Sequence, residues 1–205
     1  MGNEVNEEVT TGENGQIEKK LLPGTYLVKE LPVDRYVTPS AQYVTIESGQ
    51  TSSVHFSNIL KKFRVHVVKS DADTGNAQGD ATLAGATYGI FRDGELIDTY
   101  TTGPDGSFMT RYYVCGDGWT IREIEPSTGY LLNETIYEVG ASPSLYEVEL
   151  NTTENQVTET VIYGNIQLVK HTDDLDPDVP EGENTDDPNA GIIDARKQAQ
   201  SLKFT

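Results

Sequence analysis

The chain has 205 residues, of which 36% are hydrophobic, with a formal net charge of −18 and a mean hydropathy of −0.48. This acidity excludes a nucleic-acid-binding protein and a protein that binds anionic membranes, because no basic surface is left to meet phosphates. The single cysteine, Cys115, excludes an intrachain disulfide, and no apolar run is long enough to span a membrane. The composition favours a small all-β domain flanked by polar ends.

Short alternating runs separated by turn residues make up the first sixty residues. Residues 1–16 are acidic and polar, which predicts a loose segment and not a signal peptide. We predict strands at 25–30, 43–47 and 53–58, with a turn after the second of them at 47–50.

The run at 63–69, FRVHVVK, begins the pattern afresh. Phe63, Val65 and Val67 fall on one face of the predicted strand, and Lys69 shares their parity. Its ammonium would therefore point toward the core, where an unpaired charge is costly. The sequence thus requires a partner for Lys69.

Strand signals continue to residue 163, and none of them has a helical period. The Asp93-Gly94 pair between two alternating runs predicts a hairpin of residues 87–92 and 95–102. Short strands at this spacing are typical of a β-sandwich or barrel. The remaining strands are predicted at 108–114, 119–123, 135–139, 145–150 and 158–163.

The last part of the chain differs in composition. Residues 171–188 hold eight acidic residues and three prolines but no lysine or arginine, which predicts disorder. A short helix is predicted around 195–202.

Two parts of the sequence repeat each other. The run 26–30 (YLVKE), followed by Pro32, parallels 119–123 (WTIRE), followed by Pro126. Similarly, the run ending in Asn58 was aligned with 162–165 (IYGN), and Val67-Val68-Lys69 with Leu168-Val169-Lys170. A unit of Lys, Glu and Asn is complete only once, and its members are Lys69, Glu123 and Asn165; the partial-repeat equivalents are Glu30, Asn58 and Lys170.

These motifs resemble the collagen-adhesin B-type domains, also called SpaA-like or prealbumin-like domains, of Gram-positive surface proteins and pilins. The matching stretches are VVKSDADTG, LAGATYGIF, IREIEPSTGY and VIYGN. The resemblance covers residues 17–170. It implies an all-β, prealbumin-like or Ig-like β-sandwich, with one complete domain at 61–165. It also implies the C-terminal part of a preceding repeat at 1–60, and the first strand of a following repeat plus the acidic disordered tail at 166–205.

In that family the lysine and the asparagine join through an intramolecular isopeptide bond. The resemblance therefore implies that Lys69 is the nucleophile, Asn165 the electrophile and Glu123 the proton shuttle. The chemistry is consistent with burial, which lowers the pKa of a lysine and keeps a carboxylic acid protonated. The alternative from residue types alone is a plain Lys69–Glu123 salt bridge, with Asn165 capping a turn. We do not expect an enzyme, because the crosslinking reaction is a single turnover of the protein on itself.

The resemblance implies a structural stalk or spacer of a cell-wall adhesin or pilin-like protein, secreted, with its signal and anchor absent from this fragment. Its partners would be neighbouring repeats of the parent protein, with weak head-to-tail association as a further expectation. The alternative is an adhesive module that binds a host protein or glycan through its loops. We expect no cofactor and no metal. Asp71 to Gly75 lacks the later ligands of a calcium loop, and His55, His66 and His171 are too dispersed.

Overall fold

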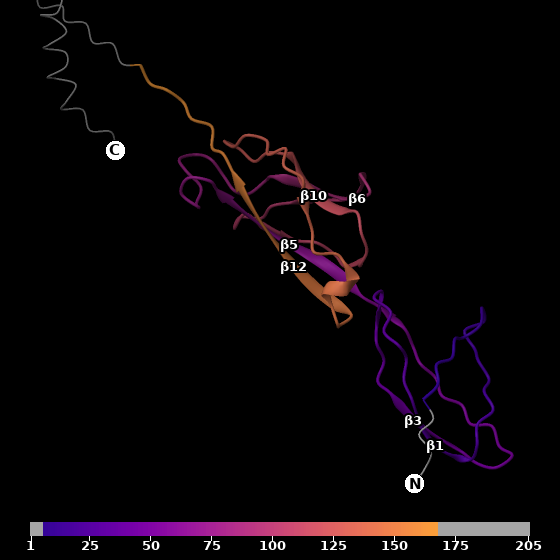
Figure 1. Cartoon of the computed structure of the whole chain (residues 1–205). Helices are drawn as coiled ribbons and strands as arrows, with labels where there is room; N and C mark the ends of the chain where they lie inside the picture. The colour runs from indigo at the N-terminus through magenta and orange to yellow at the C-terminus, as the bar shows by residue number, and fades with distance from the viewer. Residues whose placement is uncertain (1–5, 168–205) are drawn as a thin grey trace, which may run out of the picture. The chain divides into compact units, whose positions relative to one another are not determined.

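The computed structural model describes residues 6–167, and almost all of its regular structure is β-strand (Figure 1). The chain divides into a unit ending at Ile162 and a second unit beginning at Tyr163. The predictions for Lys170 and for the acidic tail lie outside the described residues. The strands are β1 (Gly24–Val28), β2 (Tyr36–Val37), β3 (Gln42–Ile46), β4 (Ile59–Leu60), β5 (Lys62–Asp71), β6 (Thr87–Arg92), β7 (Glu95–Thr101), β8 (Ser107–Met109), β9 (Tyr113–Val114), β10 (Trp119–Glu125), β11 (Tyr137–Glu138) and β12 (Leu150–Glu159), with one 3-10 turn at Pro143–Leu145.

The N-terminal strands form two small antiparallel pairs, β1 with β3 and β2 with β4. The predicted strands at 25–30 and 43–47 are confirmed with slightly shifted ends, but the strand predicted at 53–58 is not formed. In the sequence repeat, this run corresponds to the last strand of a domain. Such a strand needs a first strand beside it, and the partial repeat contains none.

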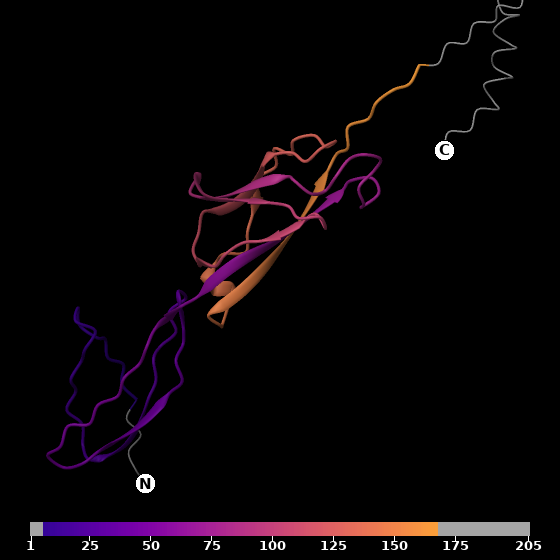
Figure 2. The same cartoon turned by 180° about the vertical axis from the view of Figure 1, so that it is seen from behind.

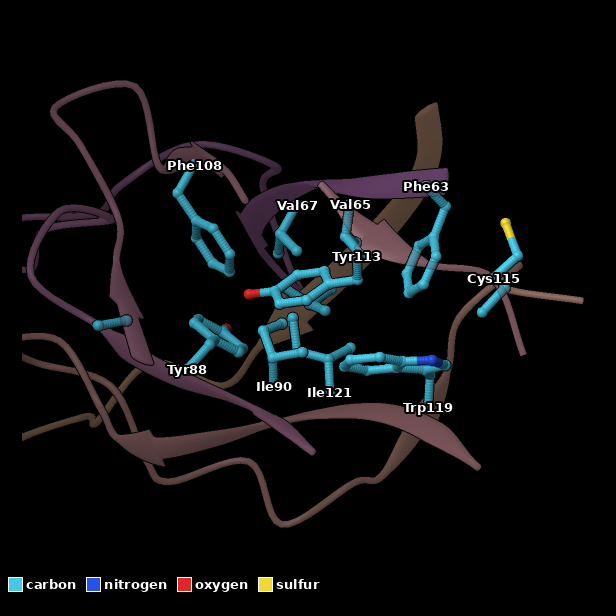
Figure 3. Close-up of a cluster of buried hydrophobic side chains, with 13 residues drawn as sticks. Phe63, Val65, Val67, Tyr88, Ile90, Phe108, Tyr113, Cys115, Trp119 and Ile121 are labelled. Atoms are coloured by element: carbon cyan, nitrogen blue, oxygen red, sulfur yellow. The ribbon is translucent and has the colours of Figure 1, made fainter. Parts of the chain in front are cut away.

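The central domain consists of two sheets that face each other. One has the order β11-β10-β6-β7, and the other has β12-β5-β8, with β9 also paired to β5. Figure 3 shows the side chains of Phe63, Val65 and Val67 from β5 directed toward Ile90 and Ile121 of the opposite sheet. Phe63, Val65, Val67, Ile90 and Ile121 are all fully buried, so the two-residue period of β5 does define the core face.

The first and last strands of this domain lie side by side and parallel (Figures 1 and 2). Strand β12 pairs with β5 over ten residues, with Leu150 opposite Lys62 and Glu159 opposite Asp71. The strands predicted at 145–150 and 158–163 are therefore wrong, since one strand spans the interval between them. Both faces of β12 carry mainly polar residues, and Val157 is its buried apolar residue. The strand therefore lacks the alternation of apolar and polar residues from which strands are predicted.

The other predicted strands are found with adjusted ends. The hairpin of β6 and β7 is confirmed, and its turn has φ 51° at Asp93 and 84° at Gly94, the left-handed pair that such turns require. The strand predicted at 108–114 is split into β8 and β9, and the one at 135–139 shortens to β11. Strand β10 runs two residues longer than predicted, with a bulge between Glu123 and Glu125.

Candidate functional site at Lys69

Lys69 lies near the end of β5 with its side chain in the core, as its parity predicts. Only 1% of the residue is exposed. Burial lowers the pKa of the Lys69 amine, and the charges of Glu159, Glu123 and Asp71 oppose that shift. A lysine with a lowered pKa is a better nucleophile at neutral pH than an exposed one.

The turn after β10 contributes two groups that contact the amine. Lys69 Nζ donates a hydrogen bond of 2.6 Å to Ser127 Oγ and lies 3.8 Å from the centre of the Tyr130 ring. The turn is tight, because Gly129 has φ 82° and a Cβ there would lie 2.6 Å from the Ala81 side chain. The glycine of the predicted motif is therefore required by backbone conformation and by packing.

Strand β10 brings Glu123 into the same part of the core. Its carboxyl accepts a hydrogen bond of 2.8 Å from the Asn133 N–H through Oε2, while Oε1 is buried without a hydrogen-bond partner. Burial raises the pKa of Glu123 to about 7, although the Asn133 N–H and the charge of Lys69 act in the opposite direction. Glu123 therefore carries a proton during part of the time at neutral pH, as a proton shuttle must.

The last strand contributes Glu159, a residue that the sequence analysis did not select. It is 1% exposed; its Oε1 accepts a hydrogen bond of 2.7 Å from the Tyr88 hydroxyl, and its Oε2 has no hydrogen-bond partner. Burial raises the pKa of this carboxyl, against the Tyr88 hydrogen bond and the charge of Lys69. Strand β12 therefore contributes a buried carboxyl group whose charge influences the Lys69 amine.

Asp71 completes the cluster but has a structural role. Burial would raise its pKa, yet hydrogen bonds from the backbone of Thr74 and Asp73, from Gln78 and from the Tyr130 hydroxyl hold the pKa at about 2. Its two oxygens thus fix the loop after β5 and the Tyr130 ring. Among the described residues, no group of His, Cys, Asp or Glu side chains has the arrangement of a metal site.

Charge balance decides the protonation of the cluster. One amine faces three carboxyl groups, and Asp71 is already ionised, so an ionised Glu123 and Glu159 would leave a net negative charge in an apolar core. This cost favours the neutral form of the two glutamates, in agreement with the raised pKa of each.

Of the predicted triad, Lys69 and Glu123 come together in the core. Asn165 lies beyond β12 in the second unit, where its side chain is exposed. Its pairing with Lys69 stays a prediction. In the partial repeat, Glu30 is half-buried and Asn58 is exposed, in contrast to the buried Glu123 and Glu159 of the complete domain.

A spacing in the sequence could have identified Glu159. Asn58 precedes Lys69 by eleven residues (69 − 58), and Glu159 precedes Lys170 by the same number (170 − 159), whereas Asn165 precedes Lys170 by only five (170 − 165). The repeat therefore aligns Asn58 with Glu159. The run VIYG at 161–164 is more apolar than β12 and has more strand character. For this reason Asn58 was matched to Asn165, which lies six residues after Glu159.

The central domain is thus a two-sheet sandwich whose first and last strands are parallel and whose core contains a buried lysine. The family model described as SpaA, prealbumin-like fold domain, matches residues 64–159, which span the central domain from β5 to the end of β12. Among the described residues 6–167, no helix is long and apolar enough to cross a membrane.

Solved structures resemble the chain at low identity. The Bacillus anthracis TIE protein is 22% identical with a TM-score of 0.58, and the match covers 74% of this chain and 28% of that protein. The full-length major pilin SpaD from Corynebacterium diphtheriae is 17% identical with a TM-score of 0.40, covering 53% of this chain and 33% of the pilin. The chain thus spans only a part of these proteins, and the first likeness concerns the fold alone. No curated protein matches the chain.

Proposed function

We propose that the chain is part of the stalk of a bacterial surface protein of the adhesin or pilin-like type, and that its central domain is a load-bearing spacer. The family model that matches residues 64–159 supports this role. The observation that carries the proposal is the parallel pairing of β5 and β12 beside the buried Lys69.

The topology suits a domain that is pulled from its ends. The chain enters the domain at the start of β5 and leaves it after the end of β12, and these strands are hydrogen-bonded in parallel over ten residues. Tension along the chain therefore shears the two strands past each other and loads their hydrogen bonds together. Such an arrangement resists extension better than strands that are peeled apart one bond at a time.

A covalent bond between Lys69 and the last strand would transmit tension directly from β5 to β12, so the residues between them would not bear it. The burial of Glu159 on β12 and the influence of its charge on Lys69 support it as the acceptor. In this reaction neutral Lys69 Nζ attacks the Cδ of protonated Glu159, an amide bond forms, and the hydroxyl leaves as water. Glu123 shuttles the proton from the nitrogen to the leaving oxygen. With Asn165 as the acceptor, as the sequence analysis proposes, the same attack would release ammonia.

Several features of the site favour the reaction. Both orphan carboxyl oxygens, Glu123 Oε1 and Glu159 Oε2, are excluded from water, and the raised pKa values favour the acid forms that the reaction needs. Holding the reactants in one place removes the entropic cost of a bimolecular step. A closed loop of about 90 residues would stabilise the domain by about 4–5 kcal/mol in the chain-entropy model.

The binding-module alternative receives less support. It predicts an exposed aromatic cluster at one loop end. Among the large hydrophobic side chains exposed in the described residues, the aromatic ones are Tyr43, on β3, and Tyr163, beyond β12.

Single-molecule pulling from both chain ends tests the spacer role. With the crosslink, residues 69–159 cannot extend, which hides 90 residues (159 − 69), or roughly 300 Å of contour length. The Lys69→Ala chain should release this length at lower force. Release of the full length by the unmodified chain would contradict a covalent tie, and a low unfolding force in both chains would contradict the load-bearing role.

A further inference from the structure

The amine of Lys69 has only two contacting acceptors among the described residues. They are the Ser127 hydroxyl oxygen at 2.6 Å and the face of the Tyr130 ring at 3.8 Å. Glu123, Glu159 and Asp71 influence the amine through their charges. An ammonium group has three N–H donors, whereas a neutral amine has two and a lone pair.

Both contacting groups are held by the rest of the fold. Ser127 is 4% exposed, and its carbonyl accepts the Tyr130 N–H at 3.1 Å, which closes the turn. The Tyr130 hydroxyl donates to Asp71 Oδ2 at 3.1 Å, which anchors the ring below the amine. Ser127 and Tyr130 therefore form a rigid cradle for Nζ.

We propose that this cradle positions Lys69 for the crosslinking reaction, with Ser127 and Tyr130 as positioning residues. Ser127 Oγ accepts one N–H and the Tyr130 ring receives the other, so the lone pair of the neutral amine is free to face an acceptor carbonyl. This inference rests on the proposed crosslink. It adds two residues that take no proton and form no bond in the reaction but fix the direction of attack.

Groups on each neighbouring element set the protonation around the cradle. Glu159 faces the amine from β12, Glu123 from β10 and Asp71 from β5, while the Tyr88 hydroxyl on β6 holds Glu159. Removing the Ser127 hydroxyl leaves all of these charges in place. Its loss should therefore change the geometry of the amine more than the pH dependence of the reaction.

The kinetic test follows crosslinking of the whole chain after cell-free synthesis. Samples are quenched in acid at timed intervals, and the intact mass of each is measured. Ser127→Ala should react roughly ten- to a hundredfold more slowly, the cost of misplacing a reacting group. The rate should be lower at every pH, and the alkaline limb, which Glu123 sets, should keep its position. Thr110→Val is the matched control, because it also removes a buried hydroxyl on the β5 side, where Thr110 Oγ1 accepts the Val65 N–H. An unchanged rate in Ser127→Ala would overturn the inference.

A second measurement is independent of the reaction. In the Glu123→Ala chain, which should not react, the Lys69 ε-methylene protons should show an upfield NMR shift from the Tyr130 ring. Adding Ser127→Ala or Tyr130→Leu should abolish the shift, whereas adding Thr110→Val should preserve it. Persistence of the shift without the Ser127 hydroxyl would overturn the cradle. If the unmodified chain never loses mass, the crosslink fails, and this shift still decides whether the cradle holds Lys69.

Discussion

Glu123 is the residue whose titration should be most visible in the stability of the domain. Its pKa rises from 4.5 in the unfolded chain to about 7 in the folded one, chiefly through burial. The folded state therefore binds more protons between these values. The stabilising contribution is complete below pH 4.5 and is lost as the pH rises through 7.

We predict that denaturant unfolding will show this loss directly. A shift of about 2.5 pKa units corresponds to at most roughly 3 kcal/mol of unfolding free energy between pH 4.5 and pH 8. The Glu123→Gln chain should lack this part of the slope, because an amide does not titrate. Equal slopes for the two chains would show that folding does not raise the pKa of Glu123.

At the scale of the elements, β12 shows how a strand can be essential and yet give no signal in the sequence. Strand β5 is predictable from its alternation of apolar and polar residues, and the β6–β7 hairpin is predictable from its Asp93-Gly94 turn. Strand β12 contributes one buried apolar residue, Val157, among asparagines, threonines and glutamates. Its position depends on its parallel pairing with β5, a contact between distant segments that local periodicity does not contain. Glu159 was missed for the same reason.

Val157 should therefore be the apolar anchor of β12. It is fully buried opposite Lys69, and Val157→Ala should lower the unfolding free energy by about 1.5–3 kcal/mol through lost burial and a residual cavity. The matched control is Val148→Ala, because Val148 is 58% exposed and should change stability by less than about 0.5 kcal/mol. Chemical denaturation of both chains checks the difference; equal losses would mean that β12 is not anchored at Val157.

At the scale of the molecule, the N-terminal pairs β1–β3 and β2–β4 expose several large apolar side chains, among them Leu27 and Tyr43. Two-stranded sheets with open edges accept further strands. We predict weak head-to-tail association of chains, with Lys170 of one reaching Asn58 of the next, as the spacing of the repeat suggests. Light scattering should show a mass that rises with concentration, and a chain truncated after Gly164 should lose this rise. A constant monomer mass at high concentration would contradict the association.

The intact mass of the folded chain tests the central claim most directly. Condensation of Lys69 with Glu159 predicts a mass lower than the sequence by one water, and fragmentation should locate the bond between these two residues. The Lys69→Ala, Glu123→Ala and Glu159→Ala chains should each keep their full mass and melt at lower temperatures than the unmodified chain. A loss of one ammonia would assign the bond to Asn165 instead. An unmodified mass after complete folding would contradict the crosslink and leave Lys69, Glu123 and Glu159 as a noncovalent buried charge cluster.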